Sequence, residues 1–277
     1  MSTYETYDET SQNYDATRVP VGSEIILGFL ALHAGQLDGL SVLDAGCGTG
    51  AYSQAILPRV RRVEAVDLSR GMLAKARAKL ALEAAAGRMG FHHGPIDDLP
   101  FAAASLDAVM INQVTHHLGD TVETGFAGLA RVLGEVARVL RPGGVLVFNH
   151  CSQDQLRHSY WYYALAPAAR ERMRRRFVPV EALRALMADA GLTVRGSCVP
   201  VDAVCQGPDY FDGRGPLGKA WRDGDSFWAL AEPDELAAAL TKVRALDDAG
   251  ELQDFVATHD AARPGLGQIT FTCATRD

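Results

Sequence analysis

The sequence is poor in cysteine, and its cysteines follow no metal-binding or disulfide pattern. The 277 residues include five, an odd number without any C-x-x-C pair: Cys47, Cys151, Cys198, Cys205 and Cys273. A structural zinc site needs closely spaced thiols or imidazoles, and a disulfide framework needs an even set of cysteines. We therefore expect inert thiols, no bound metal and a reduced, cytoplasmic chain.

Long apolar runs are also missing. IILGFLALHA, at residues 25–34, is much shorter than the roughly 20 residues that cross a bilayer. The first residues, MSTYETYDET, are acidic and polar, whereas a signal peptide begins basic and then turns apolar. We expect a soluble protein with no membrane partner and no targeting segment.

Positive charge is in deficit. The chain has 27 Lys+Arg against 34 Asp+Glu, a formal net charge of −7 at pH 7, so no global field attracts nucleic acid. The one basic run is RERMRRR, at residues 170–176. We interpret it as a solvated helix face, because an RNA contact needs a broader patch with interleaved aromatic residues.

Between residues 41 and about 149, short apolar runs alternate with helical patterns. The runs are SVLDA, RRVEAVD, RMGFHH, LDAVMIN and GVLVFN. Before the last run, apolar residues recur at three- and four-residue steps from Val122 through Phe126 to Leu140, which predicts one helix ended by RPGG. This alternation predicts a parallel sheet covered by helices.

After residue 150 the pattern is looser. It predicts helices over 158–177, 180–191 and 232–250, strands over 192–201 and 267–275, and an irregular insertion over 202–230. We expect a single domain over 1–277, made of a cap (1–40), a cofactor-binding core (41–150) and a remainder (151–277) that completes the sheet and supplies a substrate lid over about 200–262.

The stretch VLDAGCGTG, at residues 42–50, runs from an apolar strand into three glycines. It is not a P-loop, because no Lys-Ser or Lys-Thr pair follows. The dinucleotide fingerprint is G-x-G-x-x-G, but these glycines fall as G-x-G-x-G, and Asp44 would repel a pyrophosphate. S-adenosylmethionine (SAM) carries a sulfonium, an ammonium and a carboxylate, so Asp44 suits its cations and backbone N–H groups suit its carboxylate.

Asp67 ends the second expected strand, 17 residues beyond Gly50. A carboxylate there accepts hydrogen bonds from both hydroxyls of a ribose, a feature that NAD and SAM sites share. A nicotinamide oxidoreductase therefore remains an alternative. It is the weaker one, because no tyrosine has a lysine four residues further on, as the short-chain type requires.

Together, LDAGCGTG and VDLSRGML resemble the class I SAM-dependent methyltransferases. The resemblance continues through LPF at 99–101, HHL at 116–118 and LRPGG at 140–144, and so covers roughly the first 150 residues. It implies a Rossmann-like, doubly wound α/β fold with seven strands, mostly parallel with an antiparallel last strand. It also implies SAM as cofactor and S-adenosylhomocysteine (SAH) as product.

The resemblance also implies which residues bind the cofactor. Its methionyl part would lie on Asp44, Gly46, Cys47 and Gly48, its ribose on Asp67, and its adenine on Leu68 and Met72. Where the family often has an acid for the adenine amine, Pro95 follows Gly94, so that contact would pass to Ile96 or Asp97. Asn112 and Gln113, at the end of the fourth strand, complete this set. NYDATR supplies Tyr14 and Arg18, either as a cap whose arginine pairs with the SAM carboxylate or as a solvated segment.

His116 and His117 follow the fourth expected strand and His150 ends the fifth, at the edge where open α/β sheets bind ligands. Imidazole titrates near neutrality, so we select His117 and His150 as candidates for assisting deprotonation; the alternative is a structural role. Methyl transfer is an in-line displacement, so alignment in a dry site is the main task, and a soft nucleophile needs no base.

The sequence thus predicts methyl transfer from SAM to an O, N or S atom of a small metabolite. The alternative is a protein of the same fold that binds SAM or SAH without transferring the methyl group. Aromatic residues at 160–163, with Trp221, Phe227 and Trp228, either line an acceptor pocket or pack a core.

Overall fold

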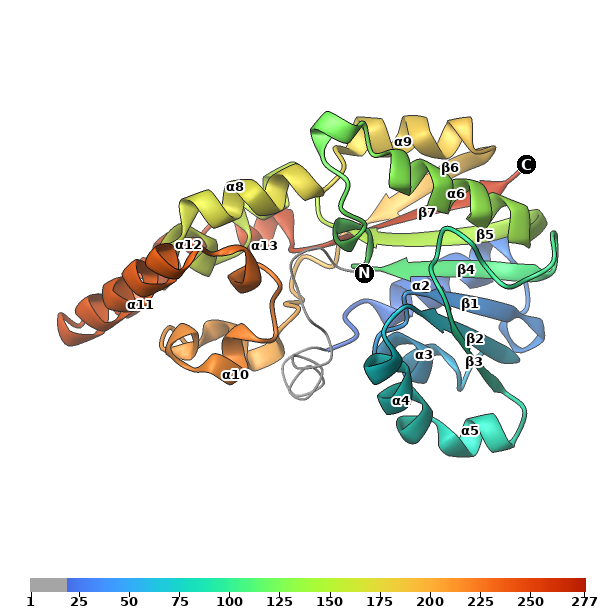
Figure 1. Ribbon diagram of the computed structural model, residues 1–277, viewed down its shortest axis with the longest axis horizontal. Helices are drawn as coiled ribbons and strands as arrows, with labels where there is room; N and C mark the ends of the chain where they lie inside the picture. Colours follow the sequence, from blue (N-terminus) through green and yellow to red (C-terminus); the bar gives the residue numbers. More distant parts are fainter. Residues whose placement is uncertain (1–18) are drawn as a thin grey trace.

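A computed structural model describes residues 19–277, and within them seven strands form one sheet in the order β3-β2-β1-β4-β5-β7-β6 (Figure 1). The strands are β1 (Ser41–Ala45), β2 (Arg62–Asp67), β3 (Met89–His93), β4 (Leu106–Asn112), β5 (Leu140–His150), β6 (Leu192–Cys198) and β7 (Thr270–Arg276). β1 to β5 run parallel, and β7 runs antiparallel to both β5 and β6. The predicted sheet with its antiparallel last strand is confirmed.

Helices cover both faces of the sheet, as Figure 1 shows. One face carries α2 (Ser23–His33), α3 (Ala51–Ile56), α4 (Arg70–Lys79) and α5 (Ala81–Ala85), and the other carries α6 (Ala127–Val139) and α9 (Val180–Asp189). Because β1 is covered on both sides, its residues alternate between two cores: Val42 packs with the first group and Leu43 with the second. Asp44 lies on the α3 face, two residues after Val42, where its side chain meets Ser53 of α3.

The helix predicted from Val122 begins later. Val122 is 56% exposed and belongs to a short 3₁₀ turn, η3 (Val122–Thr124). The next two residues, Gly125 and Phe126, both have positive φ, of 61° and 57°, which ends that turn. The carboxylate of Asp120 then accepts the N–H groups of Gly128 and Leu129, at 3.0 and 2.7 Å, and so caps α6 from outside the helix.

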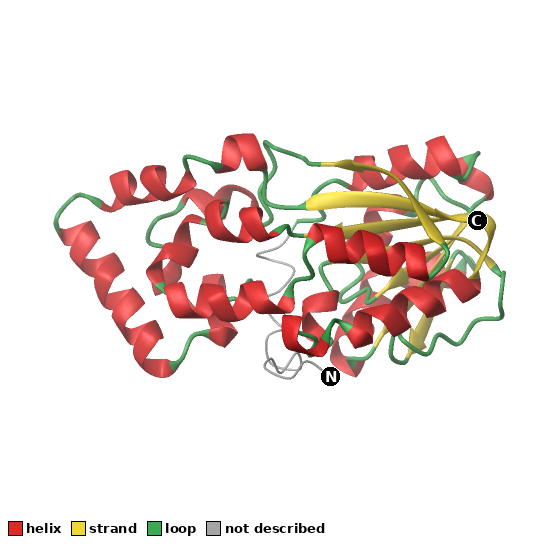
Figure 2. Ribbon diagram, turned by 90° about the horizontal axis from the view of Figure 1, so that it is seen from above, coloured by secondary structure: helices red, strands yellow, loops and turns green. Residues whose placement is uncertain are grey.

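A lobe of helices follows the carboxyl ends of the strands (Figure 2). It contains α7 (Gln153–His158), α8 (Pro167–Arg176), α10 (Lys219–Arg222), α11 (Pro233–Asp248), α12 (Leu252–Asp260) and α13 (Arg263–Leu266). Short 3₁₀ turns join them: η4 (Trp161–Leu165), η5 (Gly207–Phe211), η6 (Gly215–Leu217) and η7 (Trp228–Leu230). The single helix predicted over 158–177 is broken, because Pro167 starts α8 and disfavours helical backbone at Ala166, which has φ −136° and ψ 78°.

Aromatic side chains form the core of this lobe. Tyr163 stacks on Phe227 at 4.0 Å between ring centroids and on Tyr160 at 4.7 Å. All the aromatic residues singled out from the sequence are at most 8% exposed: Tyr160, Trp161, Tyr162, Tyr163, Trp221, Phe227 and Trp228. Such mutual stacking accounts for them as core residues.

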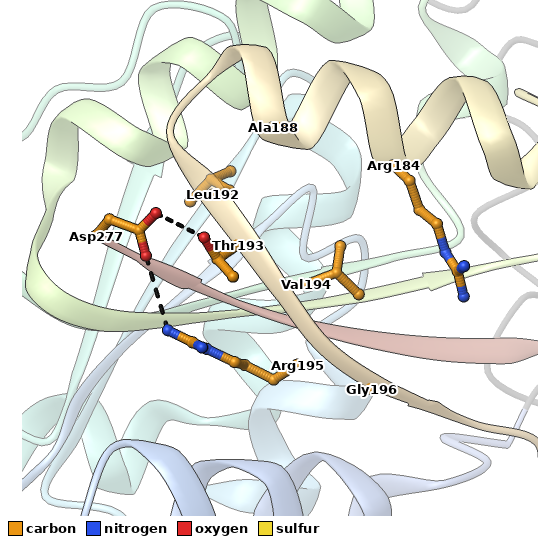
Figure 3. A pocket seen from close by; sticks show the side chains of 8 residues that line it. All are labelled: Arg184, Ala188, Leu192, Thr193, Val194, Arg195, Gly196 and Asp277. Atoms are coloured by element: carbon orange, nitrogen blue, oxygen red, sulfur yellow. Dashed lines mark hydrogen bonds and ion pairs between the residues drawn. The ribbon is translucent and has the colours of Figure 1, made fainter.

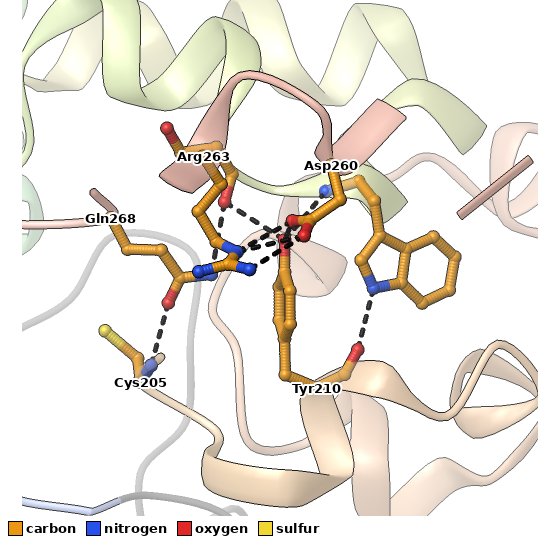
Figure 4. Close-up of polar contacts among 7 residues, drawn as sticks. Cys205, Tyr210, Asp260, Arg263 and Gln268 are labelled. Carbon is orange, nitrogen blue, oxygen red and sulfur yellow. Dashed lines mark hydrogen bonds and ion pairs between the residues drawn. The ribbon is translucent and has the colours of Figure 1, made fainter. Parts of the chain in front are cut away.

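A buried ion pair in the last helices of the lobe holds Tyr210 of the insertion (Figure 4). Arg263 donates to both oxygens of Asp260 at 2.9 and 3.0 Å, and the two side chains are 9% and 13% exposed. The hydroxyl of Tyr210 donates to the same carboxylate at 2.5 Å, and the Arg263 guanidinium lies 5.6 Å from the Tyr210 ring centre. Tyr210 belongs to η5, whereas Asp260 and Arg263 belong to α12 and α13. Their contact therefore fixes the position of η5 relative to these last helices.

We expect Arg263→Met to lower the free energy of unfolding by about 3–5 kcal/mol, because it leaves the buried Asp260 carboxylate without its cation. Urea unfolding measures the change. Arg214→Met is the matched control: Arg214 pairs with Asp247 at 2.9 Å but is 68% exposed, so the expected cost is below about 1 kcal/mol. Equal costs for the two variants would contradict this interpretation.

No helix among residues 19–277 is long and apolar enough to cross a membrane.

Candidate active site

The glycine loop turns between β1 and α3 with three residues of positive φ. Gly46, Gly48 and Gly50 have φ of 80°, 54° and 79°. A Cβ at Gly46 would lie 2.5 Å from a methyl of Val114, whereas one at Gly48 would meet none of residues 19–277 within 4 Å, apart from its own chain neighbours. Gly46 is therefore required by close packing, and Gly48 leaves open space beside bare backbone where a ligand fits.

The loop's amide groups have partners within the protein. Gly46 and Cys47 donate their N–H groups to the Val66 carbonyl at 2.8 and 3.0 Å, and Gly50 donates to the Cys47 carbonyl at 2.9 Å. Gly48 donates its N–H group to the Asp67 carboxylate at 2.7 Å. The expectation that loop N–H groups receive a ligand carboxylate is therefore not supported at these four positions.

Asp67 joins the tip of β2 to the glycine loop. The second oxygen of the Asp67 carboxylate accepts the Ser69 N–H at 2.8 Å. Burial raises the pKa of Asp67, while the hydrogen bonds from Ser69 and Gly48 lower it in part. Each carboxylate oxygen has two lone pairs, so Asp67 can accept further bonds from a ligand while it holds the loop. The sequence predicted the residue but not its bond to Gly48.

Asp44 is 1% exposed, and the Ser53 hydroxyl donates to its carboxylate at 2.7 Å, while the nearby Asn112 amide also lowers its pKa. Burial raises the pKa of Asp44 to about 7, and the nearby Asp67 charge adds to the rise, while the hydrogen bond from Ser53 opposes it. Two buried carboxylates near each other, without a cation between them among the described residues, favour a cationic ligand.

Asp44 should make stability depend on pH. Its pKa in the folded state, about 7, exceeds its ordinary value of 3.8, so the folded protein holds a proton that the unfolded chain releases. The free energy of unfolding should therefore fall as pH rises from about 4 to 7, by up to about 1.4 kcal/mol per pH unit. Urea unfolding at pH 5 and pH 8 tests this against Asp44→Asn, in which that contribution disappears. If the free energy of unfolding changed with pH equally in the wild type and in Asp44→Asn, the role given to Asp44 would be contradicted.

Asn112 ends β4 with a buried amide. The residue is 8% exposed, and its amide lies near the Asp44 carboxylate, but neither its nitrogen nor its oxygen makes a hydrogen bond of normal geometry to a described residue. Leaving both atoms without partners costs free energy, so a ligand that bonds them is favoured. Gln113 behaves differently: its amide nitrogen donates to the Asn149 side chain at 2.9 Å, so it is directed towards β5.

The residues expected at the adenine lie on two neighbouring loops. Leu68 is 38% exposed beside Asp67, Met72 is 3% exposed in the first turn of α4, and Ile96 is 7% exposed. Asp97 pairs with Arg131 at 3.3 Å and keeps 30% of its side chain exposed. Cys47 is buried in the loop, and burial raises the pKa of its thiol, so it acts as a small apolar side chain.

The candidate bases differ in surroundings. His117 is half-buried in η2 (Thr115–His117), directly after β4, with its ring 3.9 Å from that of His116. His116 stacks on Phe177 at 4.7 Å, and its Nε2 lies 3.3 Å from the Ser226 hydroxyl. His150 is 2% exposed against β7, and burial lowers its pKa to about 4, so it is a poor proton acceptor at neutral pH.

Tyr14 and Arg18 lie outside the described residues. Within residues 19–277 no group of three or more His, Cys, Asp or Glu side chains is arranged to hold a metal ion. A surface hollow of about 540 Å³ lies between α9 and β6, lined by residues such as Arg184, Arg195 and Asp277 (Figure 3). β6 is the edge strand farthest from β2 and β3, so this hollow is remote from Asp67 and from the glycine loop.

Comparisons with known proteins match the same part of the chain. Residues 43–148 match the family model described as "Methyltransferase domain". The chain is 37% identical over 133 residues to a malonyl-[acyl-carrier protein] O-methyltransferase of Pectobacterium atrosepticum, covering 48% of this chain and 46% of that one. It is 34% identical over 170 residues to a demethylmenaquinone methyltransferase of Clavibacter sepedonicus, covering 58% and 65%. The chain spans about half the length of the malonyl-[acyl-carrier protein] O-methyltransferases that it matches.

A solved structure resembles nearly the whole chain. A putative methyltransferase from an antibiotic biosynthesis pathway of Anabaena variabilis superposes with a TM-score of 0.71, covering 94% of this chain and 98% of that one at 22% identity. At this identity the likeness concerns the fold, lobe included. SAM suits the space beside Gly48, the carboxylates of Asp44 and Asp67, and the Asn112 amide, which lacks a hydrogen-bond partner among the described residues. Residues 43–148 of this chain therefore match a methyltransferase domain, and the fold of the chain is that of the solved methyltransferase structure.

Proposed function

We propose that the chain is a SAM-dependent methyltransferase that acts on an O, N or S atom of a small metabolite. The observation that carries the proposal is the bond from the Gly48 N–H to Asp67, which brings the β2 carboxylate to the glycine loop at 2.7 Å. It supports a ribose site at Asp67 beside the glycine loop, because Asp44 and Asn112 lie further along the same edge of the sheet.

Each half of the cofactor has chemical counterparts in the chain. Asp67 would accept from the ribose hydroxyls, and Leu68 and Ile96 would contact the adenine. Asp44, buried with a pKa of about 7, would ionise beside the ammonium and sulfonium, and Asn112 would bond the amino-acid end. SAM supplies an electrophilic methyl group, so the chain's own task is to align an acceptor with it and to exclude water.

The helical lobe lies where an acceptor would approach. The lobe follows the carboxyl ends of β4 and β5. Two of its residues, Ser226 and Phe177, contact His116 in η2. His117, half-buried beside it, retains the water access that a proton acceptor needs. We therefore propose His117 over His150 for assisting deprotonation, and the region after residue 150 as the cover of the acceptor.

We infer a small acceptor from two observations: the ion pairs on the protein surface, and the share of the chain that resembles its relatives. The relatives named above act on a carrier-protein conjugate and on a quinone, and their identity with this chain is confined to 48% and 58% of it. An acidic carrier protein would need unpaired cations. On α8, three of the five arginines of the basic run form ion pairs within the protein: Arg172 with Glu235, Arg174 with Glu171 and Arg175 with Glu123. This pairing favours a small acceptor.

Incubation with methyl-labelled SAM tests the proposal. A metabolite extract, freed of protein, should yield a labelled small molecule that the Asp67→Ala variant does not produce. Label recovered only with a carrier-protein fraction would show that the acceptor class is wrong. Bound SAM with no labelled product in either fraction would favour a protein that binds the cofactor without transferring the methyl group.

A further inference from the structure

Gln113 has an unusual backbone for its residue type. Its φ is 55°, and only two other non-glycine residues among 19–277, Ala104 and Phe126, have positive φ. Glutamine tolerates this region poorly, at a cost of order 1–3 kcal/mol, so surrounding contacts must hold it there. Gln113 also directly follows β4, at the edge of the sheet where ligands bind.

Three hydrogen bonds hold this turn against the end of β5. The Gln113 N–H donates to the Asn149 carbonyl at 3.1 Å, and its side-chain amide donates to the Asn149 side chain at 2.9 Å. Its side-chain oxygen accepts from the Cys151 thiol at 3.6 Å. Burial raises the pKa of Cys151 to about 12, so the thiol keeps its proton and remains a donor.

The hydrogen bonds continue in one direction. The Asn149 amide donates to the Tyr52 hydroxyl at 3.2 Å, and that hydroxyl donates to the Val21 carbonyl at 2.9 Å. This Gln113 chain consists of Cys151, Gln113, Asn149, Tyr52 and Val21. It joins the end of β5, the turn after β4, the first turn of α3 and the segment that leads into α2. Aligned donors polarise one another, so the chain holds its members more firmly than isolated pairs would.

The neighbours of Gln113 on both sides reach the cofactor site. Asn112 carries the buried amide without a protein partner, and Val114 packs against Gly46 of the glycine loop. Neighbouring strands are roughly 4.8 Å apart, so β4 lies about 10 Å from β2 in the order β2-β1-β4. With the ribose at Asp67, this separation brings the amino-acid end of the cofactor to Asn112.

We propose that Gln113 is a positioning residue for the amino-acid half of the cofactor. It acts through Asn112 and Val114 and does not itself touch the ligand. The proposal rests on the proposed function, because it assumes that SAM occupies this site. It revises the expectation from the sequence that Gln113 binds the cofactor directly.

Calorimetry with two ligands tests it. SAH has the amino-acid half, whereas 5′-methylthioadenosine has the same nucleoside and thioether without it. Gln113→Met keeps the length of the side chain and removes its hydrogen bonds, so the SAH affinity should fall about tenfold while the 5′-methylthioadenosine affinity stays within about twofold. Gln113→Gly, which adopts positive φ without strain, should lose SAH affinity in the same way, because the side chain supplies the restraint.

The matched control is Gln153→Met. Gln153 is also half-buried and donates to two carbonyls, those of Arg174 and Phe177, at 3.2 and 2.7 Å, but it lies in the lobe. The Gln153→Met variant should leave the affinities for SAH and 5′-methylthioadenosine unchanged. Equal losses for both ligands in the Gln113 variants, or wild-type SAH affinity in Gln113→Gly, would overturn the proposal. A wild-type protein that binds neither ligand would instead contradict the proposed function.

Discussion

Asp67→Ala should weaken SAM binding by about a hundredfold. The variant removes a carboxylate that accepts the Gly48 and Ser69 N–H groups at 2.7 and 2.8 Å and that we expect to accept both ribose hydroxyls. Hydrogen bonds to a charged group contribute about 1.5–3 kcal/mol each, so the loss of two ligand bonds amounts to about two factors of ten. Isothermal calorimetry with SAM and with SAH measures the change.

Asp107→Ala is the matched control for this effect. Asp107 also accepts a backbone N–H group, that of Ser41 at 2.7 Å, and its side chain is 15% exposed. It lies at the amino ends of β1 and β4, the opposite edge of the sheet. SAM affinity should therefore be unchanged. A similar loss in both variants would assign the effect of Asp67 to general destabilisation.

Gly46→Ala should lower the free energy of unfolding by about 3 kcal/mol. Gly46 has φ 80°, where a side chain is strained, and its Cβ would lie 2.5 and 2.7 Å from the two methyl groups of Val114. Backbone strain and overpacking each cost about 1–3 kcal/mol. Urea unfolding measures the sum. Gly87→Ala is the control. Gly87 also has a positive φ, of 72°, but a Cβ there would meet none of the described residues within 4 Å. Only the backbone strain therefore remains, which costs about 1 kcal/mol.

A double-mutant cycle separates the two costs at Gly46. In a Val114→Ala background the methyl groups are gone, so Gly46→Ala should cost about 1 kcal/mol less than in the wild type. An additive cycle would show that Val114 does not restrict the loop. The contact matters for function because Val114 leads into η2, which carries His116 and His117.

The cofactor half of the site was predictable because its chemistry is local in sequence. The three glycines of 46–50 need positive φ, and Asp67 ends an apolar run, so residue type and spacing alone indicate their place in a parallel sheet. The structure adds what only tertiary contact provides. The loop N–H groups are engaged by Val66 and Asp67, and Val114, which lies after β4 and more than 60 residues away, packs closely against Gly46.

Helix boundaries were less predictable, for two physical reasons. Apolar periodicity continued through Val122 and Phe126, but the side chain of Asp120 caps α6 at a later residue. Over 158–177 the pattern was helical throughout, yet Ala166 is extended before Pro167, and the tyrosines at 160–163 pack as a short 3₁₀ turn among aromatic residues from the insertion. In both cases a distant or non-periodic contact determines where the helical backbone conformation begins.

At Gln113 the structure adds what residue type does not indicate. An amide at the end of a strand suggests a ligand contact, and Asn112 agrees with that prediction, because its polar atoms are buried and unpartnered among the described residues. Its neighbour uses its amide on Asn149 instead. The positive φ at Gln113 and its bond to β5 arise from tertiary structure, and no sequence pattern indicates them. Likewise His117 and His150 are equivalent in sequence, but burial of His150 against β7 lowers its pKa to about 4.

The most direct test of the cofactor assignment is a calorimetric titration of the full chain with SAM and, separately, with NAD. The glycine loop, Asp67 and the buried Asp44 predict binding of SAM in the micromolar range and none of NAD. Binding of NAD without binding of SAM would contradict the assignment and would favour an oxidoreductase.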